Sequence, residues 1–143
     1  MSLLLDIITP EKVVFKGEAD EVIIPTTRGQ IAVLSNHANL LSQIQEGELT
    51  IRLGKEESHL AITSGFLEVA DNKVTILADY AVRSEHIEAQ KALEAKKRAE
   101  ELMKQAKERT NQKDFAIAEN ELRRALLELK VVTKRKPLKN IPS

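Results

Sequence analysis

The chain has 143 residues, enough for one ordinary domain or for a small domain with an appendage. Apolar residues make up 42% and charged residues 31%, which is typical of a folded chain, and with only 3% aromatics the core must consist of Ile, Leu, Val and Ala. The absence of cysteine excludes disulfides, thiolate metal sites and thiol nucleophiles. No run approaches the ~18 apolar residues of a membrane span, and the first residues have no basic segment, so we expect neither a span nor a secretory signal.

The formal net charge of zero hides an asymmetry. Residues 1–84 contain 7 Lys and Arg against 12 Asp and Glu, a net charge of −5, and residues 85–143 contain 15 against 10, a net charge of +5. All five glycines fall in the first 65 residues, and residues 66–136 contain neither Gly nor Pro. Because these residues mark turns, we predict short elements in the first part and long elements in the second. The opposite charges indicate that the two parts meet different partners.

The first part is predicted to consist of strands. In residues 49–53, Leu and Ile alternate with Thr and Arg, the period-two pattern of a strand with one buried face. Turn signals such as Arg28-Gly29 and Asp71-Asn72 separate such runs at intervals of roughly ten residues, which favours an antiparallel β-sandwich or flattened barrel over residues 1–83. The predicted strands are 3–9, 21–24, 31–34, 49–53, 59–63, 66–69 and 74–78.

Residues 84–133 are predicted to form an antiparallel helical hairpin, followed by a basic tail at 134–143. Ser84 is the expected N-cap, with Glu85 and Glu88 in the first turn, where the helix dipole favours negative charge. Two apolar stripes at helical spacing flank a polar gap at 110–113. The stripes are Ala92, Ala95, Ala99, Leu102 and Ala106, then Phe115, Ala118, Leu122, Ala125, Leu129 and Val132. An alanine-rich seam removes little apolar surface from water, so the hairpin is either a weakly held switch or a fixed spacer.

No motif points to catalysis. His37, His59 and His86 are far apart and lack metal-ligand spacing, so we interpret them as turn or surface residues. Phosphate-binding glycine loops and the G-x-S-x-G motif are absent. The basic clusters 96–98, 123–124 and 134–136 alternate with glutamates and have no aromatic platform, which favours a solvated face over nucleic-acid binding. We therefore predict an α+β protein that acts by binding other molecules and not by catalysis.

The segment 22–41, with Pro25, Gly29 and His37, resembles the signature of F-type ATP synthase epsilon subunits of the bacterial type. Segments 47–51, 64–69, 74–79, 114–119 and 123–125 match further family segments in the same order. The sequence departs from the family pattern at Ala32, where a Gly is usual, and at Ser35, where a Pro is usual. These departures affect local turn geometry and do not alter the expected fold.

The resemblance implies a non-catalytic, peripheral subunit of the central stalk, at the cytoplasmic face of the bacterial plasma membrane. Its sandwich would dock on the gamma subunit and the c-ring and couple ring rotation to the shaft. Family members face these two partners at the positions of Arg28, Gly29, Gln30 and His37. The hairpin would regulate ATP hydrolysis by extending toward the catalytic alpha and beta subunits, which its basic residues Arg123, Arg124, Lys130 and Lys134 would meet.

Some bacterial members bind ATP on the folded hairpin. The corresponding residues here are Ile87, Glu88, Lys91, Ala92, Arg98 and Arg124. Lys91 replaces an arginine, and a point charge is not equivalent to a forked guanidinium; Glu128 occupies a position where a basic residue is expected. We therefore expect weak or absent ATP binding and no other cofactor. The alternative to the stalk subunit is a β-sandwich and coiled-coil adaptor outside the ATP synthase.

Overall fold

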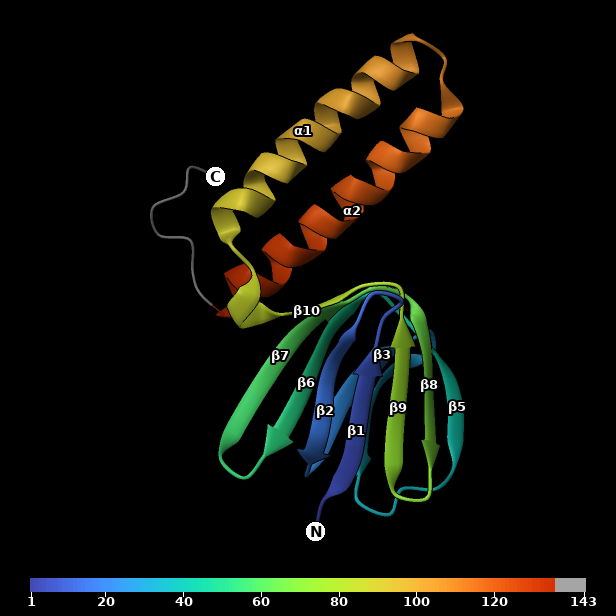
Figure 1. The fold of residues 1–143 in the computed structure, drawn as a ribbon, viewed down its shortest axis with the longest axis vertical. Helices are drawn as coiled ribbons and strands as arrows, with labels where there is room; N and C mark the ends of the chain where they lie inside the picture. The colour runs from blue at the N-terminus through green and yellow to red at the C-terminus, as the bar shows by residue number, and fades with distance from the viewer. Residues whose placement is uncertain (136–143) are drawn as a thin grey trace. The chain divides into compact units, whose positions relative to one another are not determined.

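The computed structural model describes residues 1–135, and the predicted basic tail beyond Arg135 lies outside them. Ten strands precede a 3₁₀ turn and two helices (Figure 1). The chain separates into two compact units, the first covering Met1–Glu85 and the second beginning at His86. The predicted α+β class, a β-sandwich or barrel followed by an antiparallel helix pair, is confirmed.

The first unit is one ten-stranded sheet folded into two layers. Its order is β10-β7-β6-β3-β5-β8-β9-β1-β2, with β4 on the other edge of β3. All pairs are antiparallel except β1 with β9. Because β3 pairs with β6 over three residues but with β5 only at Thr26, the sheet turns a corner there. The strands are β1 (Leu3–Ile8), β2 (Val13–Ala19), β3 (Glu21–Thr26), β4 (Gly29–Leu34), β5 (Leu40–Ile44), β6 (Gly47–Leu53), β7 (Glu56–Ile62), β8 (Gly65–Ala70), β9 (Lys73–Ala78) and β10 (Ala81–Arg83).

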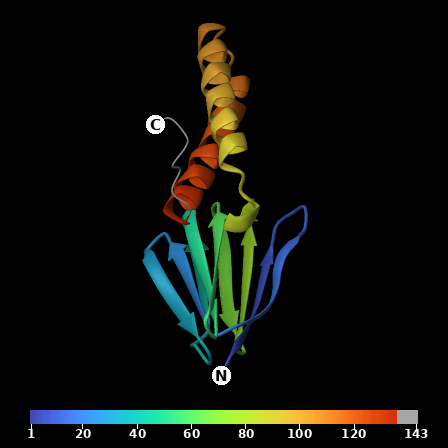
Figure 2. The same cartoon turned by 90° about the vertical axis from the view of Figure 1, so that its left-hand side faces the viewer.

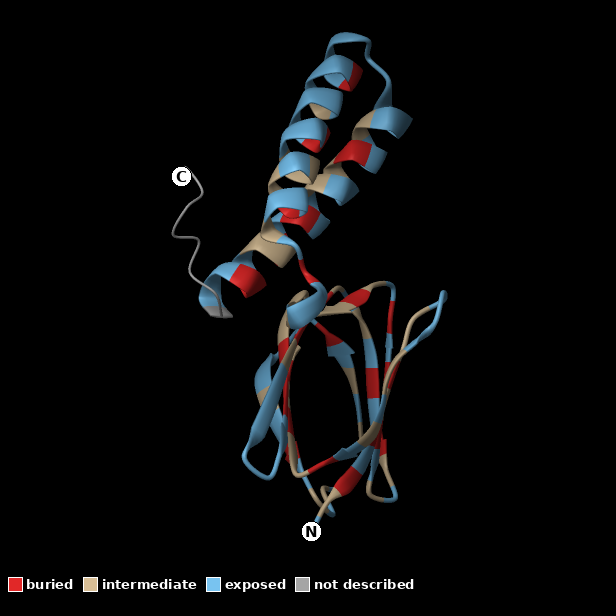
Figure 3. Cartoon of the chain, turned by 60° about the vertical axis from the view of Figure 1, so that its left-hand side comes forward, coloured by how far each residue is buried: buried red, intermediate tan, exposed pale blue. Residues whose placement is uncertain are grey.

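The core lies between the two layers and is almost wholly aliphatic. Alternate residues of β1, Leu3, Leu5 and Ile7, are buried, and the same alternation recurs along β8 and β9. Buried residues, in red, recur along the strands of the first unit (Figure 3). Leu60 and Ile76 have no exposed surface. Each such side chain contributes about 1.5–3 kcal/mol on leaving water, so this unit has the stable packing that a rigid platform requires.

All seven predicted strands are present, and three further strands were missed. Residues 13–19, 40–44 and 81–83 form β2, β5 and β10. β2 begins with three consecutive apolar residues, and β5 with two, so neither shows clean alternation. β10 has only three residues.

Two turns show why particular residues occur at the strand ends. Asp71 (φ 52°) and Asn72 (φ 60°) both lie in the left-handed region that a two-residue β8–β9 turn requires, and Asp and Asn tolerate it better than most residues. Gly65 allows a close approach of β9. A Cβ atom at position 65 would lie 2.0 Å from the carbonyl oxygen of Leu77 and 2.8 Å from Cα of Ala78.

The second unit contains α1 (Ala89–Glu108) and α2 (Gln112–Arg135), which run antiparallel (Figures 1 and 2). The prediction that Ser84 caps the first helix is wrong. Residues Ser84–His86 form a separate 3₁₀ turn, and Glu88 occupies the N-cap position without a side-chain hydrogen bond. At α2 the side chain of Asn111 does cap, because its Oδ1 accepts from the amide of Asp114 at 3.2 Å.

The predicted alanine seam is largely present. Ala92, Ala99 and Ala106 of α1 are buried, as are Ala118, Ala125 and Val132 of α2. Leu102, by contrast, is 42% exposed, because it lies at the margin of the stripe. Small residues allow the two helices to approach closely, but they bury much less apolar area per residue than the β-sandwich core does.

Candidate functional site

The part of the chain that the structure describes contains no group of three His, Asp or Glu side chains able to hold a metal ion. The histidines lie on separate elements: His37 follows β4, His59 lies on β7 and His86 ends the 3₁₀ turn. None of the helices in residues 1–135 is long and apolar enough to cross a bilayer. The candidate functional features are therefore surfaces.

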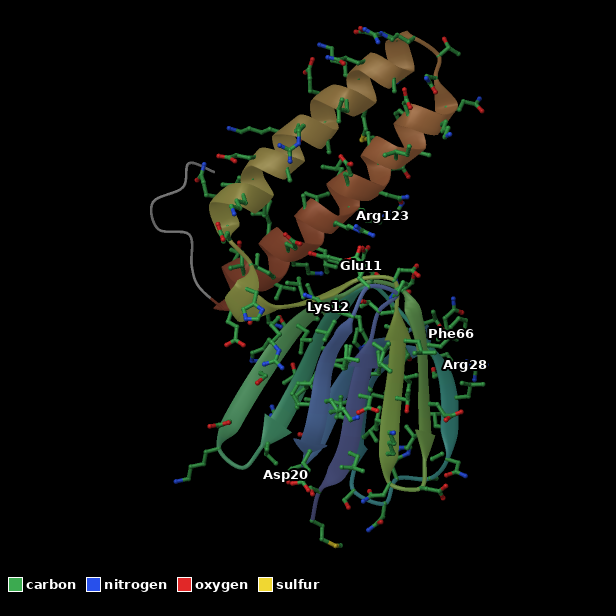
Figure 4. The ribbon with its side chains drawn as sticks, in the orientation of Figure 1. Glu11, Lys12, Asp20, Arg28, Phe66 and Arg123 are labelled. Atoms are coloured by element: carbon green, nitrogen blue, oxygen red, sulfur yellow. The ribbon has the colours of Figure 1, made fainter. Side chains whose placement is uncertain are left out.

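The first surface is the β3–β4 turn, which presents Arg28, Gly29 and Gln30, all exposed (Figure 4). The hydroxyl of buried Thr26 fixes the turn. It accepts a hydrogen bond from the amide of Arg28 at 3.2 Å and donates to the carbonyl of Gly29. Gly29 has a backbone φ of 113°, which residues other than glycine rarely adopt. The backbone of the turn is thus held in place, and it presents the Arg28 side chain at the surface.

His37 lies in the turn that follows β4. Its amide donates to the carbonyl of Leu34 at 3.2 Å, and its Nδ1 lies 2.7 Å from the carbonyl oxygen of Ala38. This turn and the Arg28 turn occupy opposite ends of the six-residue strand β4, which spans roughly 20 Å at ~3.3 Å per residue. The structure therefore separates the predicted contact residues into two sites instead of joining them in one cluster.

Asn72, which the sequence marks only as a turn residue, positions the His37 turn. Its Oδ1 accepts from the amide of Asn36 at 2.7 Å, and its Nδ2 donates to the carbonyl of Ser2 at 2.9 Å. Asn36 has φ 63°, a conformation that asparagine tolerates. One amide side chain thus ties together three segments that are far apart in sequence.

The second surface is an apolar patch on the outer face of β1, β5, β8 and β9, which sequence reasoning missed. Phe66 (57% exposed) lies opposite Leu77 (53%), and Ile8 follows on β1. Leu41 on β5 is 73% exposed. We define these four residues as the apolar patch. A groove of about 450 Å³ includes three of these four residues and is lined by Ile8, Thr9, Pro10, Gln43, Ser64, Gly65, Phe66, Leu77, Ala78 and Asp79.

A signal for this patch exists in the sequence. Phe66 shares its strand phase with Glu68, whereas Leu67 and Val69 have the opposite phase and are buried. An aromatic residue in the polar phase of a strand marks an outward apolar side chain. Its neighbours could not be identified in this way, because only strand pairing places Leu77 opposite Phe66 and Leu41 diagonal to it.

The surface of β3, β6 and β7 carries a chain of ion pairs. His59 lies within strand β7 and its side chain is 11% exposed, so it is not a turn residue and is only partly a surface residue. Its Nε2 lies 3.0 Å from Glu57 and its Nδ1 3.4 Å from Glu48. Arg52 donates hydrogen bonds to Glu57 at 3.0 Å and to Glu21 at 2.8 Å. These two bonds, chiefly the one to Glu57, raise the pKa of Arg52. Because Arg52 is already paired with two carboxylates, this surface is less suited to binding than the apolar patch.

On α2 the four predicted basic residues Arg123, Arg124, Lys130 and Lys134 are exposed. At 100° per residue, Arg123, Lys130 and Lys134 lie within about 20° of one line on the helix, opposite the Ala125 seam. Arg124 lies about 100° away from that line. Arg123 forms an ion pair with Glu119 at 3.2 Å. We define Arg123, Lys130 and Lys134 as the basic stripe.

The residues predicted for nucleotide binding do not all lie on one exposed surface. Ile87 and Ala92 are buried, and Ala92 belongs to the seam. Lys91 lies 3.4 Å from the carboxylate of Glu88, so its ammonium already has an anionic partner. Lys91 and Arg98 share a face of α1 two turns apart, and Arg124 is exposed on α2.

Both units of the chain are similar to known proteins. Residues 2–84 match the family model described as the β-sandwich domain of the ATP synthase delta/epsilon chain, and residues 85–133 match the long α-helix domain of the same chain. The chain is 45% identical over 134 residues to an ATP synthase epsilon chain of Dehalococcoides mccartyi, with 94% of each chain covered. It is 45% identical over 130 residues to that of Moorella thermoacetica, covering 90% of this chain and 95% of the other.

Two solved structures share the fold. A chain in the Euglena gracilis mitochondrial ATP synthase (OSCP/F1/c-ring) superposes with a TM-score of 0.63 at 20% identity, covering 94% of this chain and 79% of the other. A chain in the Tetrahymena thermophila mitochondrial ATP synthase (central stalk/c-ring) gives 0.51 at 17% identity, covering 60% and 69%. At these identities the likeness extends to the fold alone.

Proposed function

The chain belongs to the family of ATP synthase delta and epsilon chains, and from that membership we propose that it is a central-stalk subunit of a rotary F-type ATP synthase. In this role it joins the c-ring to the gamma subunit, so that ion-driven rotation of the ring reaches the shaft, and it catalyses no reaction itself. The observation that carries the proposal is the ordered match of both units to epsilon chains over 94% of the sequence.

The apolar patch is the proposed gamma-docking surface. Phe66, Leu77 and Leu41 are more than half exposed, although apolar side chains in strands normally turn inward. Burying such a patch against another protein provides the main favourable free energy of association. The Arg28–Gly29–Gln30 turn and the His37 turn would add polar contacts to the c-ring and gamma, and their hydrogen-bonded backbones would hold these contacts in place.

The hairpin is the proposed regulatory arm. The basic stripe on α2 faces away from the alanine seam, so its cations can meet acidic surfaces of the alpha and beta subunits without disturbing the α1–α2 contact. A seam of small residues costs comparatively little to separate, which suits an arm that changes conformation. We propose that ATP binds this arm weakly or not at all and that no cofactor is required. The site of action would be the cytoplasmic face of the bacterial plasma membrane, reached only through the complex.

Reconstitution tests this function. ATP synthase lacking its epsilon subunit is supplied with the full chain, and ATP-driven ion pumping is measured in vesicles together with ATP hydrolysis. We expect the chain to restore pumping per ATP hydrolysed, and a chain ending at residue 84 to do so with faster hydrolysis. The adaptor alternative, which family membership does not favour, predicts that neither chain changes pumping.

A further inference from the structure

The outer edge of β4 is open. β4 pairs with β3 along its whole length, and no strand of residues 1–135 pairs with its other edge (Figure 2, light blue at the left of the sheet). In the described part of the chain, the additional hydrogen bonds to its backbone lie only at its ends. They run from Thr26 to the carbonyl of Gly29 and from the amide of His37 to the carbonyl of Leu34.

The backbone groups that point outward can be assigned. Pro25 has no amide hydrogen, and its carbonyl accepts from Gln45 at 3.0 Å, on the side away from β4. Gln30, which lies opposite Pro25, therefore exchanges no hydrogen bond with β3. Because bonded and non-bonded pairs alternate in antiparallel strands, Ala32 and Leu34 also direct their amides away from β3. The outward groups are thus the amides of Gln30, Ala32 and Leu34 and the carbonyls of Gln30 and Ala32.

Natural sheets protect such edges, and the other ends of this sheet are protected. β2 carries Lys16 and Glu18, and its pairing with β1 is irregular at Ile7 and Ile8. β10 has only three residues. β5, which borders the corner, is tied to the end of β3 by a bond from Thr27 to the Gln43 carbonyl.

β4 has none of these protections. Its sequence, from Gly29 to Leu34, contains no charged residue, no proline and no bulge. The outward residues Gln30, Ala32 and Leu34 are exposed, and Leu34 is an apolar side chain with 53% of its surface in solvent. The small side chain of Ala32 at the centre leaves space for another backbone to approach.

We infer that the free edge of β4 is a strand-addition site, on which an extended segment of the partner shaft protein pairs with Gln30, Ala32 and Leu34. The segment has about five residues, no proline at its pairing positions and an apolar side chain beside Leu34. The inference rests on the proposed function and adds to it a backbone-mediated contact, distinct from the apolar patch. Main-chain pairing provides affinity and fixes the orientation of the two proteins.

The test compares Ala32→Pro with Ala32→Ser in the full chain, using the purified gamma subunit as the probe. Proline removes one outward amide without breaking a bond to β3, and edge positions tolerate it. Serine keeps the amide at similar size. We expect Ala32→Pro to weaken gamma binding about tenfold or more and Ala32→Ser to change it less than about threefold. Amide hydrogen exchange at Gln30, Ala32 and Leu34 of the unmodified chain should slow when gamma binds.

Three outcomes overturn the inference. Gamma binding without slowed exchange at these amides would show that β4 is not paired, and would leave the proposed function intact. If exchange at these amides slows in the absence of gamma as the concentration of the chain is raised, the edge is a site of self-association. Absence of any complex with gamma would contradict both the inference and the proposed function. Circular dichroism checks that the Ala32→Pro variant folds. If the variant does not fold, hydrogen exchange of the unmodified chain with gamma still tests whether β4 is paired.

Discussion

Replacing Phe66 by Ala should weaken gamma binding strongly while leaving the fold almost unchanged. An aromatic side chain buries about 150–250 Å² when fully covered. Phe66 is 57% exposed in the free chain, so docking can remove roughly 100 Å² from water. At about 25 cal/mol per Å² this amounts to about 2.5 kcal/mol, or roughly a 60-fold rise in Kd.

The stability of the free chain should fall by less than about 1 kcal/mol, because an exposed side chain loses little packing when truncated. Isothermal titration with gamma gives Kd, and urea unfolding gives the free energy of unfolding. Leu53→Ala is the matched control, since Leu53 is 41% exposed at the end of β6, outside the apolar patch. If Phe66→Ala binds gamma as tightly as the unmodified chain, or if Leu53→Ala weakens binding equally, the patch is not the docking surface.

Three further predictions follow from the same geometry. Gly65→Ala should lower the free energy of unfolding by about 3 kcal/mol or more, because the alanine Cβ would meet the Leu77 carbonyl oxygen at 2.0 Å. Urea unfolding measures this, and a loss below about 1 kcal/mol would contradict the close approach. Lys130→Glu should raise ATP hydrolysis of the reconstituted enzyme toward the level seen without the arm, and Arg124→Glu, off the basic stripe, should raise it less; equal effects would refute the stripe. Calorimetry should detect no micromolar ATP binding to the full chain, whereas Lys91→Arg with Glu128→Arg should increase affinity; tight binding by the unmodified chain would show the expectation wrong.

The fold was predictable where local pattern and tertiary environment agree. Residues 49–53 alternate cleanly in sequence, and their assignment as a strand is confirmed. The expected single buried face holds only in part, because Thr50 is buried beside Leu49 and Ile51, and Leu53 is exposed. β2 was missed because an edge strand is partly exposed on both faces, which removes the period-two signal. Ser84 fulfils the local requirements of an N-cap, yet the chain makes a 3₁₀ turn there before α1 begins at Ala89.

The surfaces were less predictable than the fold, because they depend on strand pairing. Leu41 and Phe66 are 25 positions apart, and the β5–β8 register places them diagonally, with Glu68 opposite Leu41 and Gln43 opposite Phe66. The role of Asn72 also depends on the tertiary structure, because its hydrogen-bond partners are Ser2 and the Ser35–Asn36 turn, which are far away in sequence. A sequence shows that Phe66 points outward, but not what lies beside it.

The complex with gamma is the most direct test of the account. Full-length chain and purified gamma subunit are mixed, and size-exclusion chromatography with light scattering measures the mass of the product. The stalk assignment predicts a stable one-to-one complex that the double variant Phe66→Ala, Leu77→Ala fails to form. Elution of two separate proteins at micromolar concentration would contradict it.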